Sequence, residues 1–191
     1  MNCASHLSPE MEQLRATERA EWNAWLAGDR GTPIKLMRHE PAYCVCDVIF
    51  PTQGHWISWY WRNFLAGLAH MAPLSRWKVF LYRRVGITIG QGVYIAPQVT
   101  LDPFQPGLIV LEDGCFLGLG CRLLAHDYTA TFIRFGRITV KQGAMIGAYS
   151  TVRGGVTVGE KATVGGHSFV CKDVAAGTTV GGVPAKPLNV R

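Results

Sequence analysis

The chain has 191 residues, which is enough for one domain, or for a domain with a short appendage, and excludes two large domains. Apolar residues make up 48% and charged residues 17%, so composition excludes a disordered chain. The formal charge of +6 divides evenly, with 10 basic and 7 acidic side chains in residues 1–85 and 9 and 6 in the remainder. Because nucleic-acid binders concentrate their positive charge, we expect no nucleic-acid partner.

Residues 1–85 are predicted to form a largely helical amino-terminal region that covers the end of the following domain or helps to bind an acceptor. Pro9 and Gly28 delimit one helix, and further helices are predicted over residues 55–71 and 74–84. The first residues lack the basic and apolar regions of a secretory signal, and we therefore expect a cytoplasmic protein.

The segment from Trp56 to Tyr82 is rich in aromatic side chains, and among them stand Arg62, Arg76, Lys78, Arg83 and Arg84. No uninterrupted apolar run reaches the ~20 residues that cross a bilayer. Two interpretations stay open: peripheral contact with a membrane surface, or aromatic side chains that pack over the open end of a repeat domain. The sequence favours packing, because tryptophans at helical spacing usually serve that purpose. The side chains expected to supply apolar contacts are Trp56, Trp59, Tyr60, Phe64, Leu68, Trp77, Phe80 and Leu81.

Glycine divides the chain near Gly86, since 18 of the 22 glycines follow residue 85. Beyond it an aliphatic residue recurs at intervals of six, a period of neither a helix nor a strand. These aliphatic residues are Ile89, Ile95, Leu101, Leu111, Leu117, Leu123, Val140, Ile146, Val152, Val158, Val164 and Val170. Four residues after ten of them stands a second, mostly small side chain: Val93, Val99, Cys115, Cys121, Ala144, Ser150, Val156, Ala162, Ser168 and Val174.

This period predicts an all-β solenoid in residues 86–191, in which three sides complete one coil and successive coils stack through parallel β hydrogen bonds. About four to five coils are expected. The period breaks after Leu101 and again after Leu123, so loops carrying DPFQP and DYTATFIRFGR are expected to leave the solenoid. Loops on a rigid scaffold are where chemistry usually occurs.

Residues 86–188 resemble the bacterial hexapeptide-repeat acyltransferases, and among them the maltose, galactoside and nodulation-type O-acetyltransferases. The resemblance rests on the repeats, on LLAHDYT before a protruding loop, on RITVKQGAMIG after it, and on the ending SFVCKDVAAGTTVGGVPAKPL. It implies a left-handed parallel β-helix that assembles as a homotrimer. It also implies an enzyme that transfers acetyl from acetyl-CoA to a hydroxyl of a sugar or glycan precursor. The amino-terminal region departs from the usual start of the sugar acetyltransferases, so the identity of the acceptor does not carry over.

The resemblance makes His126, at the edge of the protruding loop, the catalytic general base. Chemistry points to the same residue, because a hydroxyl acceptor must lose its proton during attack and an imidazole can take it at neutral pH. Asp102 and Asp127 are candidates to orient His126 or to bind the acceptor. Asp102 is equally interpreted as a turn former, and Asp127 is expected to point away from His126, since neighbours on an extended segment face opposite sides. His167 is expected to be a solvated corner residue.

By the same resemblance, acetyl-CoA lies in a groove between neighbouring subunits, and the positions that match its binding residues are Ala148, Gly166, Cys171, Lys172 and Lys186. The two lysines are physically suited to bind phosphates.

Two alternatives stay open: an N-acetyltransferase that acts on an amino sugar or small amine, and a noncatalytic or metal-dependent β-helix. A zinc site would need three histidines across adjacent coils, and the repeats contain His126 and His167 alone. The six cysteines show no metal-ligand spacing, so neither a metal nor a disulfide is expected; they are Cys3, Cys44, Cys46, Cys115, Cys121 and Cys171.

Overall fold

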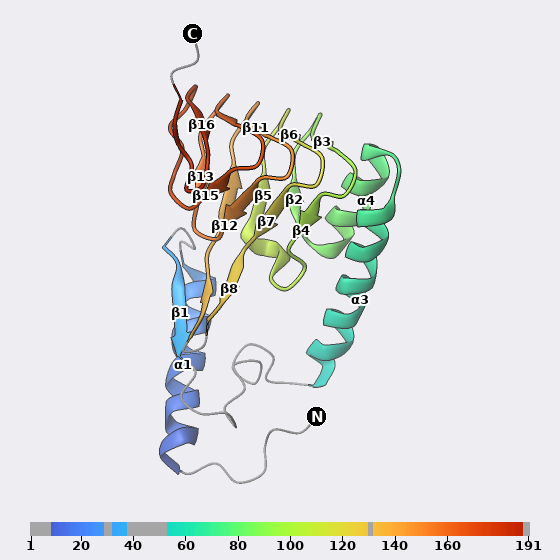
Figure 1. Ribbon diagram of the computed structural model, residues 1–191. Coiled ribbons are helices and arrows are strands. Elements are labelled where there is room, and N and C mark those ends of the chain that lie inside the picture. The colour runs from blue at the N-terminus through green and yellow to red at the C-terminus, as the bar shows by residue number, and fades with distance from the viewer. Residues whose placement is uncertain (1–8, 29–31, 38–52, 130–131, 189–191) are drawn as a thin grey trace.

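The computed structural model describes residues 9–28, 32–37, 53–129 and 132–188 (Figure 1). Three parallel sheets form the three faces of a prism, and consecutive strands lie on successive faces. The first face contains β2 (Thr88–Ile89), β5 (Ile109–Leu111), β10 (Ile138–Val140) and β13 (Thr157–Val158). The second contains β3 (Tyr94–Ile95), β6 (Phe116–Leu117), β11 (Met145–Ile146), β14 (Thr163–Val164), β16 (Thr179–Gly181) and the antiparallel β17 (Lys186–Pro187). The third contains β4 (Thr100–Leu101), β7 (Arg122–Leu124), β12 (Thr151–Arg153) and β15 (Phe169–Val170).

The stacking of coils that the six-residue period predicts is confirmed by this pairing. From β2 to β4, β5 to β7, β10 to β12 and β13 to β15 the chain completes four coils, and β16 begins a fifth. All twelve aliphatic residues of the period are buried, and so are the ten side chains four residues further on. Each fully buried aliphatic side chain contributes about 1.5–3 kcal/mol. The period therefore describes the core of the prism.

The corners of the prism leave little room for side chains. A Cβ placed on Gly147 would lie 2.5 Å from the backbone nitrogen of Gly166 in the next coil. Tyr149 and His167, two and one residues after these glycines, adopt positive φ angles of 57° and 53°. The glycine-rich repeats thus follow from the close approach of one corner to the next.

Three helices precede the prism in the described part of the chain: α1 (Pro9–Ala27), α3 (Gln53–Met71) and α4 (Ser75–Val85). They confirm the three predicted helices. None of the helices in the described ranges is long and apolar enough to cross a membrane. Helix α4 ends at Gly86, whose φ of 109° lets its N–H and that of Ile87 bond the last carbonyls of the helix.

Helix α4 packs on the first coil and α3 packs on α4, at one end of the prism (Figure 1). The Tyr82 hydroxyl donates a hydrogen bond to the Val99 carbonyl at 2.9 Å. The amine of Lys78 is buried and donates to the Ala69 and His70 carbonyls near the end of α3, at 2.9 and 3.0 Å. Burial lowers the pKa of this amine. These polar contacts join the two helices to each other and to the prism.

The expectation that the aromatic segment supplies packing contacts is wrong for much of the segment. Small residues on α3, Ala66 and Ala69, are buried, which leaves the large side chains on its outer side. The predicted packing residues that are exposed are Tyr60, Phe64, Leu68, Trp77 and Phe80. Lys78, interpreted as one of the surface cations, lies in the interior instead. The side chain of Trp56 lies outside the described residues.

The second break in the period is filled by a hairpin rather than by a loop. Strands β8 (His126–Tyr128) and β9 (Phe132–Phe135) are antiparallel, and β9 also pairs with β1 (Ile34–Met37), a strand that the sequence analysis missed. This three-stranded sheet extends from the prism beside α1 (Figure 1). The first break holds the short 3₁₀ helix η1 (Pro106–Leu108). Because β1 comes from residues 1–85, the amino-terminal region shares a sheet with the repeat region, and its division as a separate domain stays a prediction.

Candidate active site

Residues from four coils meet at one edge of the third face. In the register of its strands, Leu101, Leu123, Val152 and Val170 are successive partners. The residues that follow them in the chain are Asp102, Leu124, Arg153 and Cys171. His126 stands two residues beyond Leu124, where β8 leaves the prism. The stacking of coils therefore gathers residues that are up to 69 positions apart (102 to 171) in the sequence.

Asp102 and His126 form a hydrogen-bonded pair. The Nδ1 atom of His126 lies 2.5 Å from Oδ2 of Asp102. The Asp102 side chain is 2% exposed, whereas that of His126 is 23% exposed. A carboxylate can only accept, so Nδ1 carries a proton, and in the neutral imidazole Nε2 is then the nitrogen with the lone pair. The arrangement leaves one imidazole nitrogen able to accept a proton.

Asp102 makes the contacts expected of a residue that orients His126 and those expected of a turn former. Its second oxygen, Oδ1, accepts a hydrogen bond from the Phe104 backbone N–H at 2.9 Å, which closes the turn in the DPF segment. Its own backbone N–H donates to the Leu123 carbonyl of the next coil. The turn therefore holds the carboxylate through Oδ1, and Oδ2 bonds the imidazole.

Aromatic rings surround the imidazole of His126. The ring centres of Phe104, Tyr128 and Phe135 lie 4.9, 5.4 and 6.0 Å from it. The sequence analysis did not identify these three residues. Phe135 is the register partner of His126 across the hairpin, so a prediction of the hairpin from its alternating apolar residues would have found it.

Asp127 points away from His126 and pairs with Arg153 at 2.5 Å, Oδ2 to Nε. Its register partner Arg134 lies on the same side of the hairpin, and donates to the Gly154 carbonyl at 3.3 Å. Burial lowers the pKa of Arg134, the charge of Arg153 lowers it further, and Asp127 acts in the opposite direction. The structure thus connects Asp127 to the next coil and not to the imidazole. Sequence analysis missed both arginines.

The positions matched to coenzyme binding fall into separate groups. Ala148 and Gly166 stack at the corner between the second and third faces, where a Cβ on Gly166 would lie 3.3 Å from the Ala148 carbonyl oxygen. Cys171 is partly exposed and Lys172 exposed, at the edge of the third face that also holds Arg153. Lys186 is exposed on β17, beyond the last coil.

His167 is exposed at a corner, where its ring stacks on that of Tyr149 with centres 5.2 Å apart. This confirms its expected position on an outward corner. Its backbone N–H donates to the Ala148 carbonyl at 2.8 Å.

The cysteines in the described residues are free thiols. Cys115 and Cys121 are buried, and burial raises their pKa values to about 11 and about 12. They are therefore protonated and unreactive at neutral pH. Cys3, Cys44 and Cys46 lie outside the described residues. In the described part of the chain, no group of three or more His, Cys, Asp or Glu side chains is arranged to hold a metal ion.

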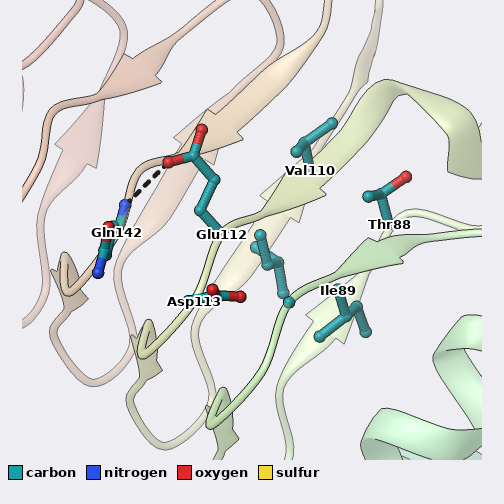
Figure 2. A pocket seen from close by; sticks show the side chains of 8 residues that line it. Thr88, Ile89, Val110, Glu112, Asp113 and Gln142 are labelled. Atoms are coloured by element: carbon teal, nitrogen blue, oxygen red, sulfur yellow. Dashed lines mark hydrogen bonds between the residues drawn. The ribbon is translucent and has the colours of Figure 1, made fainter.

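A shallow pocket of about 350 Å³ on the first face is shown in Figure 2. Glu112 in this pocket accepts a hydrogen bond from the Gln142 backbone N–H and pairs with Lys141 at 2.8 Å. Asp113 accepts from the Gln91 backbone N–H at 2.7 Å. These carboxylates stabilise the corners of adjacent coils, and the pocket lacks the imidazole and aromatic rings that surround His126.

Comparisons with known proteins agree with this architecture. No family model matches the sequence. YvoF of Bacillus subtilis (strain 168), a protein assigned to the acetyltransferases, is 32% identical over 132 residues, which are 68% of this chain and 77% of YvoF. Serine acetyltransferase of Buchnera aphidicola is 32% identical over 120 residues, 63% of this chain and 37% of that protein.

Crystal structures of two other proteins share the fold. The hexapeptide-repeat-containing acetyltransferase VCA0836 of Vibrio cholerae superposes with a TM-score of 0.62 at 19% identity, over 72% of this chain and 93% of that one. It has also been solved with acetyl coenzyme A. A maltose O-acetyltransferase of Clostridium difficile superposes with a TM-score of 0.58 at 13% identity, over 72% of this chain and 88% of that one. With its stacked coils, each built of three sides that follow the six-residue period, and its similarity to YvoF, the chain belongs to the hexapeptide-repeat acetyltransferases.

Proposed function

We propose that the protein transfers the acetyl group of acetyl-CoA to a hydroxyl of a sugar or glycan precursor, with His126 as the general base. The observation that carries this proposal is the 2.5 Å hydrogen bond between Asp102 and His126. It gives an imidazole with a defined tautomer, a free Nε2 and partial exposure to solvent. A general base needs all three.

The reaction needs no covalent enzyme intermediate. The acceptor oxygen attacks the thioester carbonyl carbon while Nε2 of His126 takes the hydroxyl proton. The resulting tetrahedral intermediate collapses with cleavage of the carbon–sulfur bond, and the imidazolium returns the proton to the leaving thiolate of coenzyme A. Asp102 holds the ring in place and stabilises the imidazolium that forms. The products are the acetyl ester and the free thiol.

Acetyl-CoA as the donor is supported by the family and by the complex of VCA0836 with that molecule. Ala148 and Gly166 offer backbone groups at a corner where side chains are small, which suits close approach of the pantetheine. Lys172 and Lys186 are exposed and can reach phosphates. No position in this set lies in the hydrophobic core.

We also propose that the prism winds with a left hand and assembles as a homotrimer, in which neighbouring copies complete the coenzyme groove. The second face carries an apolar ladder that supports such packing. Its members Tyr94, Phe116 and Met145 are register partners and are 45%, 42% and 39% exposed. The rings of Tyr94 and Phe116 stack at 4.9 Å. An exposed apolar ladder on a flat face is suited to burial between copies.

Transfer to oxygen is the preferred reaction because the fold neighbours include a maltose O-acetyltransferase. An N-acetyltransferase could use the same imidazole, since an acceptor ammonium must lose a proton before its nitrogen can attack. The two reactions differ in their products: an ester is cleaved by mild base and an amide is not. Incubation of candidate acceptors with acetyl-CoA, followed by assay of thiol release and of base lability, tests the reaction type.

Replacement of His126 by Ala is expected to lower kcat by about 10²- to 10⁴-fold, because general-base assistance is lost, with little change in the affinity for acetyl-CoA. Thiol release and acetyl-CoA titration measure the two quantities. His167→Ala, which removes an exposed imidazole on a corner, is the matched control and should remain near wild type. Wild-type turnover by His126→Ala would contradict the assignment.

A further inference from the structure

The outer side of α3 carries a continuous apolar stripe. Its residues recur at intervals of three and four, so they share about a third of the helix circumference. The stripe consists of Ile57, Tyr60, Trp61, Phe64, Leu68 and Met71, which are 76%, 66%, 60%, 56%, 42% and 80% exposed. The rings of Trp61 and Phe64 stack at 5.6 Å. Between Ile57 and Met71 no polar residue falls in this sector of the helix.

The adjacent outer side of α4 combines aromatic and basic residues. Trp77 and Phe80 are 52% and 48% exposed, and the guanidinium of Arg84 lies 5.0 Å above the Phe80 ring. Arg76 and Arg83 line a recess of about 490 Å³ between α4 and the first coil, and Phe80 also borders it. Apolar and cationic groups are therefore mixed on one surface.

Helices α3 and α4 themselves carry no acidic side chain. Between residues 53 and 101 the sequence has no Asp or Glu. With Lys78 buried and bonded, the exposed or partly exposed cations of α3 and α4 are Arg62, Arg76, Arg83 and Arg84. The two halves of the chain have the same net charge, and that total does not reveal the lack of acidic residues on α3 and α4. The seven acidic residues of the first half all precede residue 53.

We propose that the α3–α4 surface docks the enzyme on an anionic membrane surface. The α3 stripe would enter the boundary between head groups and acyl chains, and Arg76 and Arg84 would contact lipid phosphates. Aromatic side chains prefer this boundary, and each arginine near an anionic leaflet is attracted to it. An apolar stripe on α3 and an outer side of α4 that combines aromatic rings with arginines, with no carboxylate on either helix, match that chemistry.

The same observations disfavour two other occupants. A second copy of the chain would bring a second set of arginines against the first without a carboxylate to neutralise them. Nucleic acid would present polar and charged groups to Ile57, Leu68 and Met71, which offer no hydrogen bonds. The ladder on the second face, not the α3 stripe, is the surface proposed for the trimer.

Flotation of the full-length protein with vesicles tests the proposal. Binding is expected to vesicles of phosphatidylcholine in which about a third of the lipid is phosphatidylglycerol, to be weaker on phosphatidylcholine alone, and to fall in about 0.5 M salt. Trp61→Ser with Phe64→Ser should lower the partition coefficient at least about tenfold, since two apolar anchors are lost. Arg76→Glu with Arg84→Glu should abolish the preference for the anionic vesicles.

Matched control variants distinguish docking through the α3–α4 surface from nonspecific hydrophobic adsorption to vesicles. Leu119→Ser with Val183→Ser removes two exposed apolar side chains on the prism and should leave binding unchanged. Trp61→Phe should retain binding, but lose part of the tryptophan quenching by brominated lipid. Thermal unfolding and the mass in solution are measured for each variant.

Three outcomes overturn the proposal. The first is vesicle binding that is absent or that the α3 variants do not change. The second is a drop in oligomer mass in Trp61→Ser with Phe64→Ser, which would make the stripe an interface between copies. The third is retention of the wild type on DNA, but not on vesicles, that the arginine variants remove. None of these bears on acetyl transfer, which is assayed separately with soluble acceptors.

Discussion

At the scale of single residues, Asp102 determines how the imidazole of His126 can act. One oxygen of the carboxylate bonds the ring and the other closes the turn before Phe104. The side chain is almost fully buried, so the turn and the ring are held in one fixed relation. The hydrogen bond therefore links the turn at the first break in the period, after Leu101, to the proposed base at the second break, after Leu123.

Replacement of Asp102 by Asn tests this positioning role. The amide oxygen can still close the turn, but the amide cannot stabilise an imidazolium as a carboxylate does. We expect kcat to fall about 10- to 100-fold, with a changed pH profile of kcat/KM and with a melting temperature near that of wild type. Kinetics across pH and thermal unfolding measure these quantities. A loss of stability without a change in the pH profile of kcat/KM would show that Asp102 only forms the turn and does not position His126.

At the scale of elements, side-chain hydrogen bonds of Ser75, Tyr82 and Arg83 dock α4 on the first coil. The hydroxyl of Tyr82 is buried and bonds the Val99 carbonyl. Burial raises the pKa of Tyr82 from its ordinary value of 10.0 to about 12. The unfolded chain therefore releases this proton at lower pH than the folded protein does. It follows that the contribution of Tyr82 to stability is complete below pH 10 and declines as the pH rises from 10 to about 12.

The substitution Tyr82→Phe makes that pH dependence measurable. At pH 8 the variant should be about 1 kcal/mol less stable than wild type, because one buried hydrogen bond is lost. At pH 11 the difference should be close to zero, since ionisation of Tyr82 then stabilises the unfolded wild-type chain by about 1 kcal/mol and the variant has no such group. Urea unfolding of both proteins at the two pH values gives the comparison. An equal difference at both values would contradict the assigned cause.

At the scale of the whole molecule, the amino-terminal region reaches the proposed active site through packing. Trp22 of α1 is 2% exposed, and its ring centre lies 4.7 Å from that of Phe135. Phe135 in turn faces His126 in the hairpin register. A chain of contacts thus runs from the first helix to the imidazole, although Trp22 makes no contact with His126 among those described.

Replacement of Trp22 by Ala is expected to cost about 3–5 kcal/mol of stability, through the cavity it leaves. It should also lower kcat about tenfold or more, because the hairpin that carries His126 loses its support. Trp77→Ala, on an exposed tryptophan of α4, should change stability by no more than about 0.5 kcal/mol. Chemical unfolding and thiol-release assays compare the two variants. Equal effects at the two positions would refute the coupling.

Sequence analysis anticipated the prism because its signal is local. Each aliphatic residue of the period serves the same buried site in its own coil, so the pattern repeats along the chain. His126 was identified from the family resemblance and from the chemistry of a general base, and it stands where the period breaks. Strand β1 was missed, since four residues with a partner about a hundred positions away leave no periodic signal. The exposure of Trp61 and Phe64 could not be predicted either, because the spacing of apolar residues in a helix does not determine which side of the helix packs on the rest of the protein.

The sequence by itself determined the repeat, its buried positions and the three helices, and its resemblance to a known family indicated the residue proposed as the base. The repeat and the helices follow from short-range rules of spacing and side-chain type, which act within one coil or one helix. The tertiary structure decided which carboxylate reaches the imidazole, which aromatic rings surround it and which side of α3 stays exposed. Those are relations between coils and elements distant in the chain, and only the stacking of the coils and the docking of the helices bring them into contact.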